Sequence, residues 1–352
     1  MLNWLKKNQY IVKVYECIFG PIHWFVFMMK HIKWPSLEKT HFSYGKLNKN
    51  KKFYVIKYDR PECGIFSMIF HLVPQIEYAV RRNYIPIIDC RETHLPMIQN
   101  KENAGKENAW EYYFEQPLDN FSLDEVYHSK HVIYVRKNGG GLKKSLSYND
   151  IPLSDEDLHY WSGIFNKYLK PNILIKEKME REKVVFPKDK RILGVSIRAE
   201  YRWGGLLKDP LYYQHPKVAD CENFISEISK MMKEWSYDKF FLACDDREYS
   251  DRIAKHFGDK CIRINRPLLH FFENNLPIIS SEERISEFKD YSTQKRNEDY
   301  IVETYLLSQC DSLYACIASG VQFAYIINGG KYKNMLIDDK GLWTKEDLKI
   351  ER

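Results

Sequence analysis

The chain of 352 residues is long enough for two domains, and it is 44% hydrophobic and 29% charged. These proportions exclude an intrinsically disordered protein and favour a globular one. Because the 54 basic and 48 acidic residues are interleaved, the net charge of +6 forms no dense basic patch. We therefore expect no nucleic-acid partner and only a mild preference for anionic ligands.

Residues 1–35 combine lysines, tryptophans and an apolar run, as signal peptides, membrane anchors and core helices all do. The run at 18–29 is interrupted by Gly20 and Pro21 and is shorter than the ~20 apolar residues of a spanning helix. Two interpretations stay open: a packed helical hairpin broken at Gly20, or an amphipathic segment in peripheral contact with a membrane. In either case we expect a cytoplasmic protein, in the second case on the inner face of the membrane.

The first half of the chain predicts a βαβ unit. A strand within 51–59 (KKFYVIKYD) is followed by a glycine turn and a helix with one apolar face, which leads to a strand at 84–90 (YIPIIDC). Strand, helix and strand in this order are typical of a parallel sheet. Another strand is expected at 130–137 (KHVIYVRK), ahead of an NGGG loop at 138–141.

The second half alternates strands and helices more regularly. A charged segment at 170–190 is typical of a helix that crosses between domains. After it, strands are expected at 191–197, 239–244, 260–264 and 312–316, and helices after Asp220, at 247–257, at 297–309 and at 321–328. We therefore predict an α/β protein with two Rossmann-like domains that face each other, at 1–175 and 185–340, followed by a tail at 341–352.

Ligands of such sheets bind beyond the carboxyl ends of the parallel strands, where loops lead into helices. This rule selects Arg198, Asp245 with Asp246, and residues 317–320. The Arg198 guanidinium is a permanent fork of donors that suits a pyrophosphate, and it helps most where a leaving phosphate gains charge. The alternative is a surface arginine that pairs with a nearby acid.

The other two strand ends also have two interpretations each. Asp245 can accept two hydrogen bonds from a guanine edge or a ribose, or it can cap the following helix, a role that suits Asp246 better. Ala318, Ser319 and Gly320 are small enough to admit a phosphate to the N-terminus of the next helix, which favours negative charge. The alternative is a tight turn in which glycine accommodates any positive φ.

Three segments together resemble a known family. GVSIR (194–198), FLACDD (241–246) and YLLSQCDSLYACIASGVQFAY (305–325) are similar, in order and spacing, to the three conserved regions of the fucosyltransferase superfamily. That group includes the core α1,6-, nodulation and protein O-fucosyltransferases, and the likeness is closest to bacterial relatives from lipopolysaccharide and capsule gene clusters. Those relatives also show a GIFS turn and a WEYYFEQP segment, here at 64–67 and 110–117. The resemblance covers residues 53–340.

The resemblance implies a GT-B fold and an inverting, metal-independent transfer of a sugar from a nucleotide donor, typically GDP-fucose, without a cofactor. Residues 185–340 would bind the nucleotide sugar, and residues 1–175 would bind the acceptor glycan. Within residues 1–175, the acceptor side of the cleft would include Gly64, Phe66 and Ser67. The expected role is the synthesis of bacterial surface polysaccharide.

By position, the resemblance assigns donor-binding roles. Arg198 would hold the β-phosphate, Asp245 the guanine, and Ala318, Ser319 and Gly320 the pyrophosphate. Ser196 also belongs to the expected donor-binding residues. The first region of the family often reads His-x-Arg, sometimes followed by another Arg. This chain departs from that pattern, because Ser196 replaces the histidine and Ala199 follows the arginine.

Sugar transfer also needs a base for the acceptor hydroxyl and an electrostatic sink for the leaving GDP. Arg198 supplies the sink, and Glu200 is the best-placed base, with Asp209 and His215 as rivals. The departures at 196 and 199 favour one alternative, a non-catalytic nucleotide-sugar or glycan-binding protein on the same fold. A different Rossmann-type enzyme is a third hypothesis, against which the absence of G-x-G-x-x-G counts.

The remaining motifs favour structural roles. An acidic triplet at 155–157 contains the D-x-D of other glycosyltransferases, but it follows Ser154 at a predicted helix start, where acids stabilise the first turn. His128 and His131 lack further ligands, and residues 139–141 lack the Gly-Lys-Ser/Thr of a phosphate loop. None of the eight cysteines stands in a C-x-x-C pair, so we expect reduced thiols and no metal site.

Overall fold

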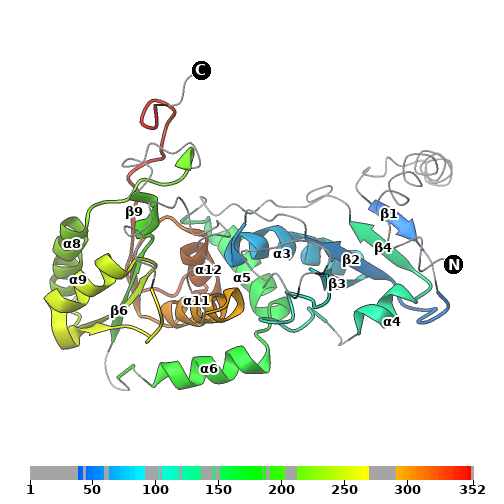
Figure 1. Ribbon diagram of the computed structural model, residues 1–352. Coiled ribbons are helices and arrows are strands. Elements are labelled where there is room, and N and C mark those ends of the chain that lie inside the picture. Colours follow the sequence, from blue (N-terminus) through cyan, green and yellow to red (C-terminus); the bar gives the residue numbers. More distant parts are fainter. Residues whose placement is uncertain are drawn as a thin grey trace.

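The computed structural model describes residues 39–42, 45–58, 63–91, 103, 105–118, 121–135, 146, 151–184, 186–187, 191–202, 212–268 and 291–349. Residues 1–35, the loop at 138–141 and Asp209 lie outside these ranges. The described residues form two sheets that lie apart in space, with helices packed between them (Figure 1). The predicted α/β class is confirmed.

The first sheet contains the predicted βαβ unit. Its strand order is β1 (Lys39–Phe42), β4 (Val132–Val135), β2 (Phe53–Lys57) and β3 (Ile85–Asp89). β2 is parallel to both neighbours, whereas β1 is antiparallel to β4. α3 (Ile65–Arg81) connects β2 to β3, and its apolar positions are buried as their helical spacing predicted. A short helix, α4 (Leu123–Tyr127), precedes β4.

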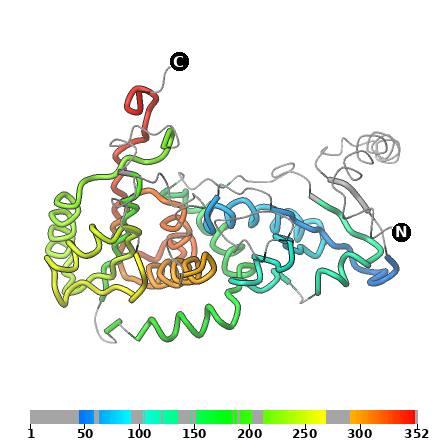
Figure 2. The backbone as a smooth tube through the Cα atoms, in the orientation of Figure 1, coloured from blue at the N-terminus to red at the C-terminus, as the bar shows by residue number. Residues whose placement is uncertain are grey.

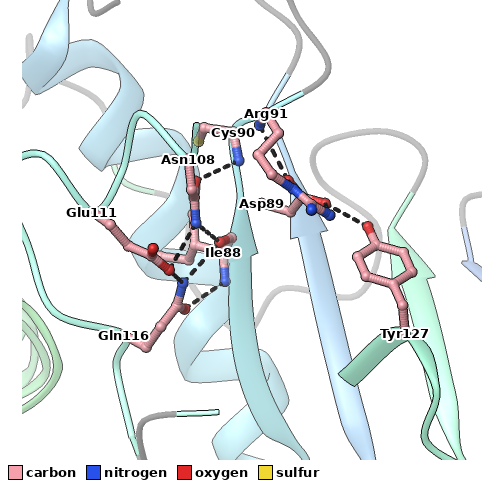
Figure 3. A network of polar contacts seen from close by, with 8 residues as sticks. All are labelled: Ile88, Asp89, Cys90, Arg91, Asn108, Glu111, Gln116 and Tyr127. Atoms are coloured by element: carbon pink, nitrogen blue, oxygen red, sulfur yellow. Dashed lines mark hydrogen bonds and ion pairs between the residues drawn. The ribbon is translucent and has the colours of Figure 1, made fainter. Parts of the chain in front are cut away.

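Side-chain amides close the free edge of β3 (Figure 3). Gln116 accepts a hydrogen bond from the Ile88 N–H and donates one to the Ile88 carbonyl, at 2.9 and 3.0 Å. Asn108 accepts from the Cys90 N–H at 2.9 Å and also donates to the Ile88 carbonyl. Glu111 accepts from both amides, which fixes them in place. These side chains therefore satisfy backbone groups that a neighbouring strand would otherwise bind.

The second sheet is entirely parallel across its described strands. Its order is β7 (Cys261–Ile262), β6 (Lys239–Cys244), β5 (Ile192–Ile197), β8 (Ser312–Cys316) and β9 (Met335–Asp338). Its main helices are α8 (Cys221–Glu234), α9 (Arg247–Phe257), α11 (Thr293–Ser308) and α12 (Ser319–Asn328). The predicted second α/β unit is thus present, with a shorter β7 and an additional edge strand, β9.

Polar residues begin most of the helices, as the sequence predicted. Asp220 accepts a hydrogen bond from the Asn223 N–H at the start of α8, and Asp246 accepts one from the Tyr249 N–H at the start of α9. Ser154 caps α5 (Asp155–Tyr168) in the same way, so the acidic triplet at 155–157 forms a first helical turn. Among the described residues, no group of His, Cys, Asp or Glu is arranged to hold a metal ion.

The core continues from one sheet to the other through α3, α5, α11 and α12 (Figures 1 and 2). Phe66 on α3 is 1% exposed and lies 4.8 Å from the Tyr300 ring and 4.7 Å from the Phe323 ring, measured between centroids. The prediction that Phe66 faces an acceptor is therefore corrected: its ring packs between the two units because large apolar side chains gain most from burial.

A linking helix and the C-terminal tail complete the chain. The charged segment forms α6 (Ile173–Lys183), which contains the predicted domain boundary and joins α11 through an ion pair of 2.7 Å between Lys178 and Asp299. The Trp343 indole in the tail donates to the Tyr201 carbonyl at 2.9 Å. The seven cysteines in the described ranges are free thiols. Nowhere in those ranges is a helix both long and apolar enough to cross a membrane.

Candidate active site

The carboxyl ends of β5, β6 and β8 meet at one pocket, because these strands are adjacent and parallel. The pocket encloses about 910 Å³ when the open space at its mouth is included. Its lining comprises Gly64, Ile65, Ser196, Ile197, Arg198, Ala243, Cys244, Asp245, Arg266, Pro267, Tyr291, Arg296, Asn297, Tyr300, Glu303, Thr304, Ala318 and Gly320. Of the predicted donor-binding residues, all but Ser319 line this pocket. Of the three residues predicted on the acceptor side, Gly64 lines it, whereas Phe66 and Ser67 do not.

Arg198 follows β5 and forms ion pairs with two carboxylates. Its Nη2 lies 3.0 Å from Glu200 Oε2, and its Nε lies 3.3 Å from Asp245 Oδ2. The guanidinium also stands over the Tyr201 ring, 5.5 Å from the centroid. Glu200 can reach back because a short 3-10 turn, η2 (Ala199–Arg202), follows the strand at once. The Arg198 side chain remains 24% exposed, so its outer face is available to a ligand in the pocket.

Asp245 belongs to the same cluster. Its Oδ1 accepts a hydrogen bond from the Ala199 N–H at 2.8 Å, and its Oδ2 faces Arg198. Burial raises the pKa of Asp245 to about 7, against the lowering effect of Arg198 and together with the repulsion from Glu200. The helix after β6 is capped by Asp246, so the cap interpretation of Asp245 is wrong. Asp245 positions Arg198 in this structure, and its contact with a guanine stays a prediction.

Two helix N-termini open on the pocket without a side-chain cap. The described α-helices α4, α5, α6, α8, α9 and α11 each begin with a residue whose side chain accepts a hydrogen bond from the first turn. α3 begins at Gly64 and α12 at Ala318 without such a bond, and both residues line the pocket. Uncapped N–H groups and the helix dipole together favour an anion at this place.

Gly320 is small for a reason that the sequence did not reveal. A Cβ built on it would lie 2.5 Å from the Tyr300 hydroxyl and 3.4 Å from the Phe66 ring. Its φ does not lie in the left-handed region, so the turn requires no positive φ there. The glycine therefore lets the Tyr300 side chain of α11 approach α12 at the pocket wall.

The predicted bases lie elsewhere than expected. Glu200 is 1% exposed and lies against Arg198, outside the pocket lining. His215 is partly buried between the rings of Tyr201 and Tyr212, and burial lowers its pKa below the ordinary 6.5. We therefore correct the role of Glu200: its geometry is that of a residue that positions the Arg198 guanidinium.

Sequence reasoning missed the residues that α11 and the chain before it contribute. Arg266 reaches Glu303 at 2.8 Å and the Cys244 carbonyl at 2.9 Å, and Arg296 also lines the pocket. A signal for α11 was present: polar residues recur at helical spacing and continue into the apolar C-terminal half of the helix, at Thr293, Arg296, Asn297, Tyr300, Glu303 and Thr304. Such a stripe on a buried helix indicates a site or a polar contact.

No protein-family model and no curated protein matches this sequence. Solved structures with a similar fold include the fucosyltransferase NodZ from Bradyrhizobium, at 13% identity and a TM-score of 0.44, over 78% of this chain and 92% of that chain. A NodZ structure soaked with GDP-fucose gives a TM-score of 0.45. A variant of Arabidopsis thaliana FUT1 in complex with GDP has 12% identity and a TM-score of 0.42, over 84% and 72% of the two chains. POFUT1 in complex with GDP has 9% identity and a TM-score of 0.43, over 82% and 99%.

The two NodZ structures are named as those of a fucosyltransferase. At this level of identity the likeness concerns the course of the chain.

Proposed function

We propose that this protein is an inverting, metal-independent glycosyltransferase that moves a sugar, fucose from GDP-fucose, onto a glycan acceptor. Bacterial surface polysaccharide, made on the cytoplasmic side of the membrane, is the proposed setting. The donor would occupy the pocket at the ends of β5, β6 and β8, and the acceptor would approach from the side of α3.

One observation carries this proposal: the pocket combines arginines with uncapped helix N-termini. Three guanidiniums, those of Arg198, Arg266 and Arg296, line it together with the two uncapped helix N-termini at Gly64 and Ala318. A diphosphate can bind several such donors at once, and its charge is favoured at a helix N-terminus. The remaining lining is largely apolar or aromatic, which suits the rest of a nucleotide sugar.

The proposed reaction follows from this arrangement. The acceptor hydroxyl oxygen forms a bond to the anomeric carbon of the sugar while the bond from that carbon to the diphosphate oxygen breaks. The diphosphate takes the bonding electrons and gains charge, which Arg198 is placed to stabilise. Glu200 and Asp245 hold the guanidinium before the reaction, so little reorganisation is needed. A general base takes the proton of the hydroxyl.

The test is Arg198→Lys. Lysine keeps a positive charge beside Glu200 and Asp245, so the buried carboxylates stay compensated and the fold survives. A point charge cannot replace the fork, and the loss of one preorganised donor costs about 10²–10³ in rate. We expect the turnover of GDP-fucose, measured as GDP release, to fall by about 10²-fold and the melting temperature to change little. Arg198→Ala should lose at least as much turnover.

Arg252→Lys is the matched control, since Arg252 forms exposed ion pairs with Glu222 and Glu248 away from the pocket. Unchanged turnover in Arg198→Lys would remove Arg198 from the mechanism. The alternative function, a non-catalytic nucleotide-sugar-binding protein, is favoured by one observation: Arg198 is already paired with two carboxylates. It predicts tight GDP binding without GDP release from any sugar donor by the wild-type protein.

A further inference from the structure

The three guanidiniums of the pocket differ in their partners. Arg198 has Glu200 and Asp245 within 3.3 Å, and Arg266 has Glu303 at 2.8 Å. For Arg296, the described residues provide no ion pair with a carboxylate, and its Nη2 atom is buried without a hydrogen-bond partner. The pocket therefore contains one cation that the described part of the chain does not neutralise.

Arg296 is held at the pocket by its position on α11. It lies in the first turns of this helix, which begins after the Ser292 cap. The next residue, Asn297, donates a hydrogen bond of 3.3 Å to the hydroxyl of Tyr113, a buried residue of the first half of the chain. This bond anchors the start of α11 between the two units and fixes the direction in which the Arg296 side chain leaves the helix.

A buried guanidinium nitrogen without a partner is unfavourable for folding. Burial lowers the pKa of Arg296, and the nearby charge of Arg198 lowers it further, whereas Tyr113, Tyr291 and Glu200 act in the opposite direction. Buried polar groups in folded proteins nearly always have partners, and an exception requires an explanation. A ligand that supplies the missing acceptor is one explanation, and here the residue lines a pocket with uncapped helix N-termini.

We propose that Arg296 is a second phosphate-binding residue of the donor site, which lines the same pocket as Arg198 and hydrogen-bonds to the diphosphate of the nucleotide sugar. This assignment rests on the proposed function, since the ligand class is the same. Arg198 is restrained by two carboxylates and serves the charge that develops in the reaction. Arg296 is unrestrained by any described carboxylate, and its role is therefore the affinity for the ground-state diphosphate.

The first measurement is the dissociation constant of GDP and of guanosine for the full chain and for Arg296→Gln, by titration calorimetry. We expect GDP to bind the variant at least about tenfold more weakly, about 1.4 kcal/mol, and guanosine to bind both proteins equally. In turnover, KM for GDP-fucose should rise more than kcat falls. Arg296→Lys should recover part of the affinity, and Arg252→Gln on α9 is the charge-matched control.

The second measurement separates binding from a structural role. Because Arg296→Gln removes a buried charge that lacks a partner, we expect the ligand-free variant to melt at the same temperature as the wild type or higher, and to gain less from added GDP. A structural arginine predicts the opposite, a lower melting temperature with unchanged GDP affinity in the folded fraction. That result would overturn the proposal, as would equal GDP affinity of variant and wild type.

Binding of inorganic pyrophosphate separates a failure of the proposed function from a failure of the role proposed for Arg296. If the wild type binds pyrophosphate but not GDP, and Arg296→Gln abolishes this binding, the anion site stands and the nucleotide-sugar function fails. If the wild type binds GDP and the variant binds it equally well, the function stands and the role of Arg296 fails. If the wild type binds neither pyrophosphate nor GDP, both inferences are wrong.

Discussion

At the scale of residues, the site depends on how one guanidinium is shared between two carboxylates. Glu200 and Asp245 both pair with Arg198, and burial disfavours the charged form of Asp245 so that its pKa rises to about 7. Near neutral pH this carboxyl therefore gains or loses its proton. When it is charged, it lowers the positive potential that an incoming diphosphate meets. The site is thus tuned by a group that need not touch the ligand.

This arrangement predicts a pH dependence of donor binding. Since Asp245 is protonated below about pH 7 and charged above it, GDP-fucose should bind more weakly as the pH rises from about 6 to about 8. The diphosphate of GDP-fucose does not titrate in this range, and the pKa of His215 lies below its ordinary 6.5. Asp245→Asn keeps an acceptor for the Ala199 N–H and should remove the dependence.

The sign for stability follows from the same shift. An unfolded Asp245 titrates near its ordinary 3.8, so the folded protein holds an extra proton between about pH 4 and pH 7. The contribution of this group to the free energy of unfolding therefore decreases as the pH rises through that window. Asp251→Asn, an exposed carboxylate on α9, is the control. For the donor affinity, the contradicting result is an equal pH dependence in wild type and Asp245→Asn, because Asp245 would then not be the titrating group.

At the scale of elements, α11 and α12 form the pocket wall through one close approach. Tyr300 of α11 fits against Gly320 of α12, where an added Cβ would lie 2.5 Å from the phenol oxygen, and Phe66 of α3 packs on the same ring. The contact therefore links both halves of the chain at the pocket. It also explains why a glycine stands in the first turn of a buried helix, where its conformational freedom would otherwise be a cost.

Gly320→Ala should accordingly lower the free energy of unfolding by about 1–3 kcal/mol through overpacking. Tyr300→Phe removes the clashing oxygen, so the double variant should be less destabilised than the sum of the two single variants. Gly163→Ala on α5 is the matched control, since no atom lies within 4 Å of its added Cβ and alanine is the better helix former. Urea unfolding measures the wild type and these four variants, and additive effects of the two single changes would contradict the contact.

The sequence was most informative about elements with regular patterns. The strands before Arg198 and Asp245 and the helices after Asp220 and Asp246 were predictable, because apolar runs and N-cap residues act locally. The contribution of α11 to the site was not predicted. Its polar stripe becomes a pocket wall only where α3 and α12 pack against it, and such long-range contacts leave no mark in local composition.

At the scale of the whole molecule, the two sheets are joined by a continuous core, and the pocket lies at this junction. Gly64 and Ile65 of the first half line it together with the strand ends of the second half. The convergence of three strand ends was predictable from the rule for parallel sheets. The burial of Phe66 and of Glu200 was not, since their sequence positions do not show which side of the junction each residue faces.

The central claim is that this pocket binds a nucleotide diphosphate through its arginines and helix N-termini. The most direct measurement is calorimetric titration of the full chain with GDP and, in parallel, with UDP, in a buffer that contains a chelator. We predict saturable binding of GDP that is tighter than that of UDP and needs no metal. At about 100 times the dissociation constant, GDP should stabilise the fold by about 2.7 kcal/mol. Absence of binding by either nucleotide, or equal or tighter binding of UDP, would contradict the account.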